Sequence, residues 1–210
     1  MHKPLLYLFG GSFNPPHRGH IEPLLALQQQ YGVGNITLLP NHISPLKLDQ
    51  PPVSNAHRLA MLQLCTAEFP SLTISDYELT QPETSFTFNT LLHFSEHYRV
   101  FFIIGEDSLQ SFDKWHRYAD IMQLCHIIVL PRDQVQTKVG TLPKKIVQNI
   151  NTLTQGPIHH KIGCITRVIL PRVNISSTQC RLELLNRDIE SQFITPSVLN
   201  YIRIHHLFAN

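Results

Sequence analysis

The chain has 210 residues, a length that suits one compact domain with its own hydrophobic core. Hydrophobic residues make up 42% and charged residues 15%, a balance that argues against intrinsic disorder. The formal net charge is only +2 and no block of like charges is present, so neither a nucleic acid nor an anionic membrane is indicated as a partner.

The first apolar run, within MHKPLLYLFGGSF, is too short for a membrane span and is interrupted by glycines. It therefore predicts a buried strand rather than a membrane anchor or a signal peptide. None of the cysteines forms a CxxC pair, so neither a zinc site nor a disulfide framework is indicated. A reduced, cytoplasmic setting is the expectation for these four residues, Cys65, Cys125, Cys164 and Cys180.

Short apolar runs alternate with segments of helical periodicity along the chain. Strands are predicted at residues 5–9, 36–39, 100–104, 126–130 and 168–170, and helices after His20, after Ser54, at 86–96, near Ser177 and from Thr195-Pro196. Residues 41–52 are rich in Pro and Asn and predict a mobile loop, whereas residues 133–165 give no clear pattern. The alternation predicts an α/β fold in one domain over residues 1–210: a single Rossmann-like, doubly wound parallel sheet with C-terminal helices.

The sequence is most informative where the first strand runs into GGSFNPPHRGH, residues 10–20. Ligands of open α/β sheets bind at the carboxyl ends of strands, and glycines there let backbone amides approach a phosphate. The helix that follows adds unpaired N–H groups and a partial positive charge. His17 and His20 lie one helical turn apart, so both imidazoles can donate to one phosphoryl group, and Gly19 leaves room for a nucleotide. A turn with two solvent-facing histidines is the alternative, which this full context disfavours.

A second motif, ISSTQCR, covers residues 175–181 and precedes another predicted helix. Ser177 and Thr178 fit a helix cap and a phosphate site equally well. Arg181 follows Ser177 by four residues and falls on the same side of the helix start. Amides, hydroxyls and a guanidinium together would make a strong polyphosphate site.

These two motifs resemble the GxFxPxHxGH and ISSTxxR motifs of the HxGH nucleotidylyltransferases, and match neither a GxGxxG nor a P-loop pattern. The resemblance implies that His17 and His20 steady the α-phosphate of ATP and that Arg181 meets the departing pyrophosphate. It also implies an ATP site that comprises Gly10, Gly11, Ser12, Phe13, Gly19, Ile175, Ser177 and Thr178.

The acceptor is indicated by four further stretches, LLPNHISPLK, ETSFTFNTL, FIIGEDSLQSFDKWHRYADI and FITPSVLNYIRIHHLF. They resemble bacterial nicotinate mononucleotide adenylyltransferases almost end to end. The resemblance implies that Asn41 and Lys47 lie in an acceptor-side loop, with Lys47 near phosphate. It further implies that Thr87 lies near the nicotinate carboxylate, that Asp107 accepts from a ribose hydroxyl and that Trp115 stacks on the pyridine ring.

Each acceptor-side residue has a simpler alternative. Trp115 could be ordinary packing, Asp107 and Thr87 could be helix caps, and Lys47 could be a solvated loop residue. The loop also departs from the family, because Leu46 stands where a histidine is usual. The family's SYT stretch has become SFT at residues 85–87.

The implied reaction joins ATP and nicotinate mononucleotide to give nicotinate adenine dinucleotide and pyrophosphate. The attacking phosphate is already an anion, so no general base is required, and Mg²⁺ is expected to arrive with ATP rather than on protein ligands. Rival acceptors are nicotinamide mononucleotide and phosphopantetheine, and a non-catalytic nucleotide-binding module is a rival from another class. The weakest rival is a zinc peptidase, because His93 to His97 formally match HxxEH. The oligomeric state is not predicted.

Overall fold

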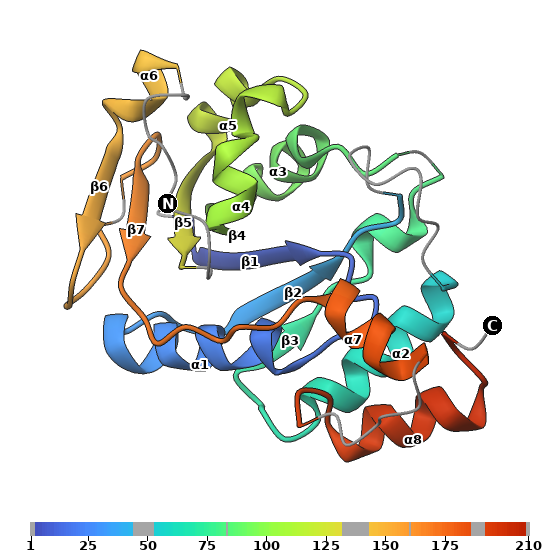
Figure 1. The fold of residues 1–210 in the computed structure, drawn as a ribbon. Coiled ribbons are helices and arrows are strands. Elements are labelled where there is room, and N and C mark those ends of the chain that lie inside the picture. The colour runs from blue at the N-terminus through green and yellow to red at the C-terminus, as the bar shows by residue number, and fades with distance from the viewer. Residues whose placement is uncertain are drawn as a thin grey trace.

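The computed structural model describes residues 3–43, 53–82, 84–131, 143–159, 161–185 and 192–208. Its described strands form one seven-stranded sheet in the order β3-β2-β1-β4-β5-β7-β6, and every pairing is parallel (Figure 1). The strands are β1 (Leu5–Gly11), β2 (Ile36–Pro40), β3 (Leu72–Ile74), β4 (Arg99–Gly105), β5 (Cys125–Leu130), β6 (Ile150–Leu153) and β7 (Ile165–Val168).

Helices cover both faces of this sheet, as the doubly wound prediction requires. Figure 1 shows α1 (Arg18–Tyr31), α2 (Asn55–Thr66) and α8 (Pro196–Ile204) on one side and α3 (Thr87–Ser95), α4 (Glu106–Gln110) and α5 (Tyr118–Leu124) on the other. The remaining helices are α6 (Lys144–Val147) and α7 (Ser177–Leu185), with short 3₁₀ turns at Tyr77–Thr80 and Phe112–Lys114. The prediction of a doubly wound α/β fold is confirmed.

The hydrophobic core is divided in two by the sheet, because successive side chains of a strand point to opposite faces. In β1, Tyr7 and Phe9 pack into the cluster under α1, α2 and α8, whereas Leu8 packs into the cluster under α3 to α5. The two central strands β4 and β5 are buried along almost their whole length. Their continuous apolar runs are typical of a parallel sheet covered on both faces.

The predicted strand at 168–170 is displaced, since β7 occupies Ile165–Val168. The reason is a hydroxyl group on another element. Tyr31, the last residue of α1, accepts from the N–H of Ile169 at 2.9 Å and donates to its carbonyl at 3.0 Å. Those backbone groups are therefore unavailable to the sheet, and the strand ends at Val168. Strands β3 and β6 were not predicted.

The predicted caps are found at two helices. Ser54 accepts from the N–H of His57 at the start of α2, and Thr195 with Pro196 begins α8. All four cysteines have free thiols. Within the described part of the chain, no helix is long and apolar enough to cross a membrane.

Candidate active site

The strand order reverses between β1 and β4, and the site lies at the carboxyl ends of these two neighbours. β1 ends at Gly10-Gly11 and β4 ends at Gly105, and the register pairs Phe9 with Ile103. Helix α1 begins after the loop that follows β1, and α4 begins directly after β4. This is the topological switch point at which open α/β sheets bind their ligands.

The histidine pair predicted from the first motif is formed at the start of α1. His17 is the N-cap residue and His20 is the third residue of the helix. Their ring centroids are 3.8 Å apart, and both residues are buried. The backbone N–H of His17 donates to Nδ1 of His20 at 3.2 Å, so a neutral His20 ring carries its proton on Nε2. His20 is thereby held as an Nε2 donor.

The second motif lies directly against the loop of the first. Arg181 donates through Nη1 to the carbonyl of Asn14 at 2.8 Å, and Ser177 Oγ donates to the carbonyl of Pro15 at 3.1 Å. A second nitrogen of Arg181 contacts Thr178 Oγ1 at 3.2 Å. The structure therefore brings together two motifs that are about 160 residues apart in the sequence.

The side chain that caps α7 belongs to Ser176, the residue before Ser177. The N–H of Gln179 donates to Oγ of Ser176, so Ser176 performs the capping. Ser177 is the first residue of α7 and uses its hydroxyl proton to reach Pro15. Its oxygen can still accept, and the hydroxyl is committed to the first motif rather than to its own helix.

Gly19 lies where the two motifs pack closely against each other. A Cβ atom at Gly19 would lie 2.7 Å from Cγ2 of Ile175 and 3.0 Å from the His17 ring. A side chain at Gly19 would therefore collide with protein atoms, one from each motif. The role expected for Gly19 beside the nucleotide stays a prediction. Ile175 itself is buried, so it has little freedom to withdraw.

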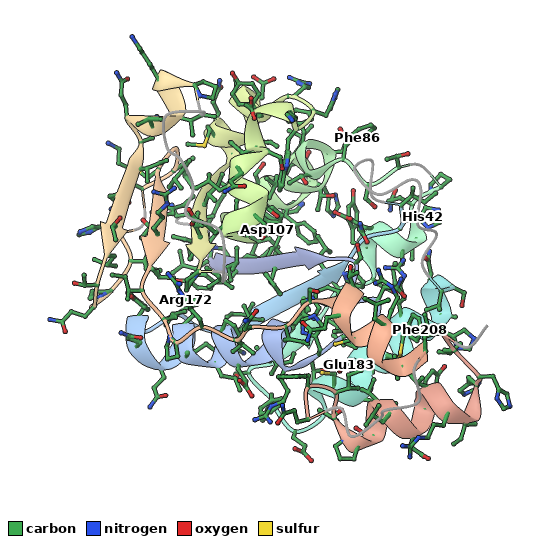
Figure 2. The ribbon with its side chains drawn as sticks, viewed as in Figure 1. His42, Phe86, Asp107, Arg172, Glu183 and Phe208 are labelled. Atoms are coloured by element: carbon green, nitrogen blue, oxygen red, sulfur yellow. The ribbon has the colours of Figure 1, made fainter. Side chains whose placement is uncertain are left out.

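The acceptor-side residues come from four different elements around the same end of the sheet. Asn41 follows β2, and its N–H donates to the carbonyl of Gly11 at 3.0 Å. Thr87 is the first residue of α3, and Asp107 is an exposed residue in the first turn of α4. Lys47 lies outside the described residues. Figure 2 labels His42 and Phe86, the neighbours of Asn41 and Thr87, on the side of the molecule to which β1 points.

The simpler alternatives for two of these residues are not supported. The N-cap of α3 is Phe86 rather than Thr87, and the N-cap of α4 is Gly105, with no side-chain capping bond at either helix. The ring of Trp115 is half-buried, and its centroid lies 5.4 Å from that of Phe112. It therefore contributes to packing, and its stacking on the pyridine ring stays a prediction. Within the described part of the chain, its indole N–H is buried and has no hydrogen-bond partner.

The two histidines of the HxxEH match lie on and after α3. His93 stacks on Tyr77 at 4.3 Å with the two rings 12° from parallel, and His97 is exposed on the turn after α3. Among the residues that the structure describes, no group of three or more His, Cys, Asp or Glu side chains could hold a metal ion.

A separate cavity of about 770 Å³ lies between α1, α2 and the start of α8. Its lining is mostly apolar and includes Leu25, Phe69 and Leu199. No predicted site residue lines it. The cavity is therefore distinct from the histidine pair and the motif contacts.

Sequence reasoning missed Arg58, a fully buried residue of α2. The signal was available, because Arg58, Met61, Leu62 and Cys65 follow the spacing of one helix face, and the other three are core residues. An arginine on an apolar face must find acceptors inside the protein. Its acceptors include backbone carbonyls just after β1 and β2.

Glu78 is a second buried charged residue that was missed, in the 3₁₀ turn after β3. Its carboxylate accepts from Thr90 Oγ1 at 2.6 Å. Burial raises the pKa of Glu78, and the hydrogen bonds from Thr90 and Ser85 lower it by less. Ser85 in turn accepts from the N–H of His42 at 2.9 Å, so this carboxylate supports the turn that carries Asn41.

We expect Glu78 to make the stability of the protein depend on pH. The pKa of Glu78 is higher in the folded state, so the folded protein binds this proton more tightly than the unfolded chain does. The protonated carboxyl therefore adds to the free energy of unfolding at low pH, and this stabilisation is lost as pH rises through the folded pKa. Glu78→Gln keeps a neutral side chain. Its free energy of unfolding, measured with urea from about pH 4 to about pH 8, should therefore rise relative to wild type. Exposed Glu68→Gln is the control, and a flat difference for Glu78→Gln would show that Glu78 does not titrate in this way.

Comparisons with known proteins agree with the fold and indicate a family. A sequence model of the cytidylyltransferase-like family matches residues 8–183. Similar curated proteins include probable nicotinate-nucleotide adenylyltransferases from Pseudoalteromonas atlantica, 32% identical over 98% of this chain and 95% of that protein, and from Psychromonas ingrahamii, 35% identical over 95% and 94%. A similar protein of the same name from Yersinia pestis is 34% identical over 97% and 95%.

Solved structures share the fold at lower sequence identity. The nicotinic acid mononucleotide adenylyltransferase of Plasmodium falciparum, complexed with NaAD, has a TM-score of 0.75 and 18% identity, and the match covers 98% of this chain and 97% of that one. A second similar structure is that of a Vibrio parahaemolyticus protein described as a nicotinate-nucleotide adenylyltransferase. Its TM-score is 0.62 at 17% identity, and the match covers 98% of this chain and 95% of that one.

The doubly wound sheet carries paired histidines and an arginine-bearing helix at its switch point, and the family match over residues 8–183 makes this chain an α/β protein of the cytidylyltransferase-like class. Within that class, the chain belongs to the nicotinate-nucleotide adenylyltransferase family.

Proposed function

We propose that this protein transfers the adenylyl group of ATP to nicotinate mononucleotide, forming nicotinate adenine dinucleotide and releasing pyrophosphate. The observation that carries the proposal is the direct contact between the two phosphate motifs, through Arg181 to Asn14 and Ser177 to Pro15. The names of the full-length relatives support the acceptor. The NaAD in the Plasmodium falciparum structure supports the product.

The proposed chemistry is transfer between two phosphates by positioning and electrostatic stabilisation. The acceptor phosphate attacks the α-phosphorus as an anion, so no residue has to remove a proton. Nε2–H of His20, with His17 beside it, donates to the α-phosphate oxygens as negative charge develops on them. Arg181 and the start of α7 hold the departing pyrophosphate.

We further propose that Mg²⁺ enters with ATP, bound by phosphate oxygens and water. The groups gathered at the site are imidazoles, amides and a guanidinium, which can donate to phosphate oxygens, whereas Mg²⁺ prefers oxygen ligands. When bound, the ion would neutralise part of the triphosphate charge.

Four free thiols also fit a reducing compartment, which supports a cytoplasmic location.

The acid form of the acceptor is supported by the beginning of α3. Its first turn has no acidic residue, and Phe86 offers no side-chain cap, so the partial positive charge of this helix is available to a carboxylate at Thr87. A carboxamide would gain less from the same position.

Trp115 would stack on the pyridine ring and Asp107 would accept from a ribose hydroxyl. Asn41 and Lys47 would bind the acceptor from the loop after β2.

Pyrophosphate release tests the proposal most directly. Purified protein with ATP and Mg²⁺ is offered nicotinate mononucleotide, nicotinamide mononucleotide or phosphopantetheine in separate reactions. We expect fast turnover with the acid and little with the other two acceptors. Equal rates with acid and amide would remove the acid preference, and release only with phosphopantetheine would replace the acceptor. No release with any acceptor, together with tight ATP binding, would indicate a non-catalytic module.

A further inference from the structure

Arg58 is a cation held inside the protein by neutral oxygens. Its residue exposure is 0%, and burial lowers the pKa of its guanidinium. Every acceptor it contacts in the described part of the chain is a backbone carbonyl or an amide oxygen. Its Nε is buried without a partner among those residues. A buried, incompletely satisfied cation is a costly way to stabilise a fold, which points to a role beyond stability.

The partners of Arg58 come from the two strand ends that border the site. Nη1 donates to the carbonyl of Ser12, in the loop after β1, at 2.8 Å. Nη2 donates to the carbonyls of Asn41 at 2.6 Å and His42 at 3.2 Å, in the turn after β2. One planar group thus joins the loop predicted to bind ATP to the turn predicted to bind the acceptor.

Asn55 fixes the orientation of this guanidinium. Its Oδ1 accepts from Nη2 of Arg58 at 2.6 Å, so its amide nitrogen is the donor to Nδ1 of His42, also at 2.6 Å. On the far side of the turn, Ser85 accepts from the N–H of His42, and the N–H of Ser85 donates to the carbonyl of Ile43 at 3.1 Å. The turn is held from both sides, by α2 and by the segment that leads into α3.

We propose that Arg58 is a positioning residue of the transfer reaction: its guanidinium fixes the acceptor-binding turn at Asn41 relative to the ATP-binding loop at Ser12. The inference rests on the proposed function and adds a residue to it that contacts neither substrate. An in-line transfer depends on the relative placement of two substrates, and a shift of about 1 Å can cost about 100-fold in rate. The hydrogen bonds of Arg58 to the ATP-binding loop and to the acceptor-binding turn act on that placement directly.

Arg58→Lys is the most informative variant, because it keeps the positive charge and removes the planar guanidinium. A lysine ammonium has three donors at one point and cannot span acceptors on two strand ends as a planar guanidinium does. Arg99→Lys is the matched control, since Arg99 is an exposed residue at the start of β4. Asn55→Ala is a milder second variant, which loosens Arg58 without replacing it, should Arg58→Lys fold poorly.

Two readouts are taken on each variant. Hydrogen exchange of the free protein should be at least about tenfold faster at the Asn41 and His42 amides in Arg58→Lys, and unchanged at Ile127 in β5. In the pyrophosphate assay, kcat should fall and KM for nicotinate mononucleotide should rise, each by about tenfold or more. The Kd for ATP should stay within about threefold of wild type. Asn55→Ala should show the same pattern with smaller changes.

The outcomes separate the two proposals. Unchanged exchange at Asn41 and His42 would overturn the positioning role, whatever the activity. A fall in kcat with unchanged KM, and with faster exchange throughout the protein, would show a purely structural role and also overturn it. If wild-type protein turned over none of the acceptors, the proposed function would fall. The exchange result would then decide whether Arg58 ties the two loops together.

Discussion

Replacing His20 with alanine is expected to lower kcat for pyrophosphate release by about 100- to 1,000-fold, the usual effect of removing one donor to a developing oxyanion. The ring of His20 is buried beside His17, and its Nδ1 is occupied by the backbone N–H of His17. Its Nε2–H is thereby oriented as a donor in the proposed reaction. Because the charge develops in the transition state, we expect a smaller change in the Kd for ATP than in kcat.

The control for His20 is another histidine of the same chain. His97 is exposed after α3 and belongs to the discarded HxxEH match, so His97→Ala should retain wild-type kcat. The melting temperature must be measured for both variants, because His20→Ala also removes the acceptor of the His17 N–H at the start of α1. Full activity in a folded His20→Ala protein would refute the role assigned to the histidine pair.

Gly19→Ala is expected to lower activity strongly and to destabilise the protein. The new methyl group would meet Ile175 at 2.7 Å and the His17 ring at 3.0 Å, closer than such carbon atoms normally approach. Overpacking of a filled site costs about 1 to 3 kcal/mol. The strain would also push His17 and the second motif apart, so kcat should fall by more than the loss of folded protein explains. Urea unfolding and the pyrophosphate assay on the same sample separate the two effects.

A double variant identifies the contact that is responsible. Ile175→Ala removes the Cγ2 atom that the new methyl group would meet, at the cost of a cavity in the core. If the clash with Ile175 dominates, Gly19→Ala should be less damaging in the Ile175→Ala background than in wild type. Additive effects would show that the His17 ring, or the backbone of α1, is the main obstacle.

The two phosphate motifs could be recognised in the sequence because the residues of each lie within one short segment. Residues 10–20 contain a strand end, three glycines and two histidines one turn apart, and residues 175–181 contain the hydroxyls and the arginine. Local spacing at a helix start fixes which of these side chains share a face. The sequence could not show that Ser177 and Arg181 bond to Pro15 and Asn14, since that contact depends on how α7 packs on the loop after β1.

Some features could be read only after folding, because their partners are remote in sequence. The strand predicted at 168–170 ends early at Val168 because the Tyr31 hydroxyl, from the end of α1, takes the backbone groups of Ile169. Arg58 is a charged residue on an otherwise apolar helix face, and its acceptors, the carbonyls of Ser12 and Asn41, reach it only in the folded protein. The acceptor-side assignments of Lys47, Thr87, Asp107 and Trp115 remain predictions that the proposed assays address.

The sequence by itself determined the fold class, because short continuous apolar runs and segments of period 3.6 alternate along the chain, and such alternation is compatible with few architectures. It also predicts the chemistry of the two phosphate motifs, because each motif consists of contiguous residues. Only the tertiary structure decided how the ends of β1, β2 and β4 meet, which hydroxyl caps α7 and which buried charge ties the loops together. Those contacts are made between distant segments, and their energy exists only when the sheet and both helical layers are in place.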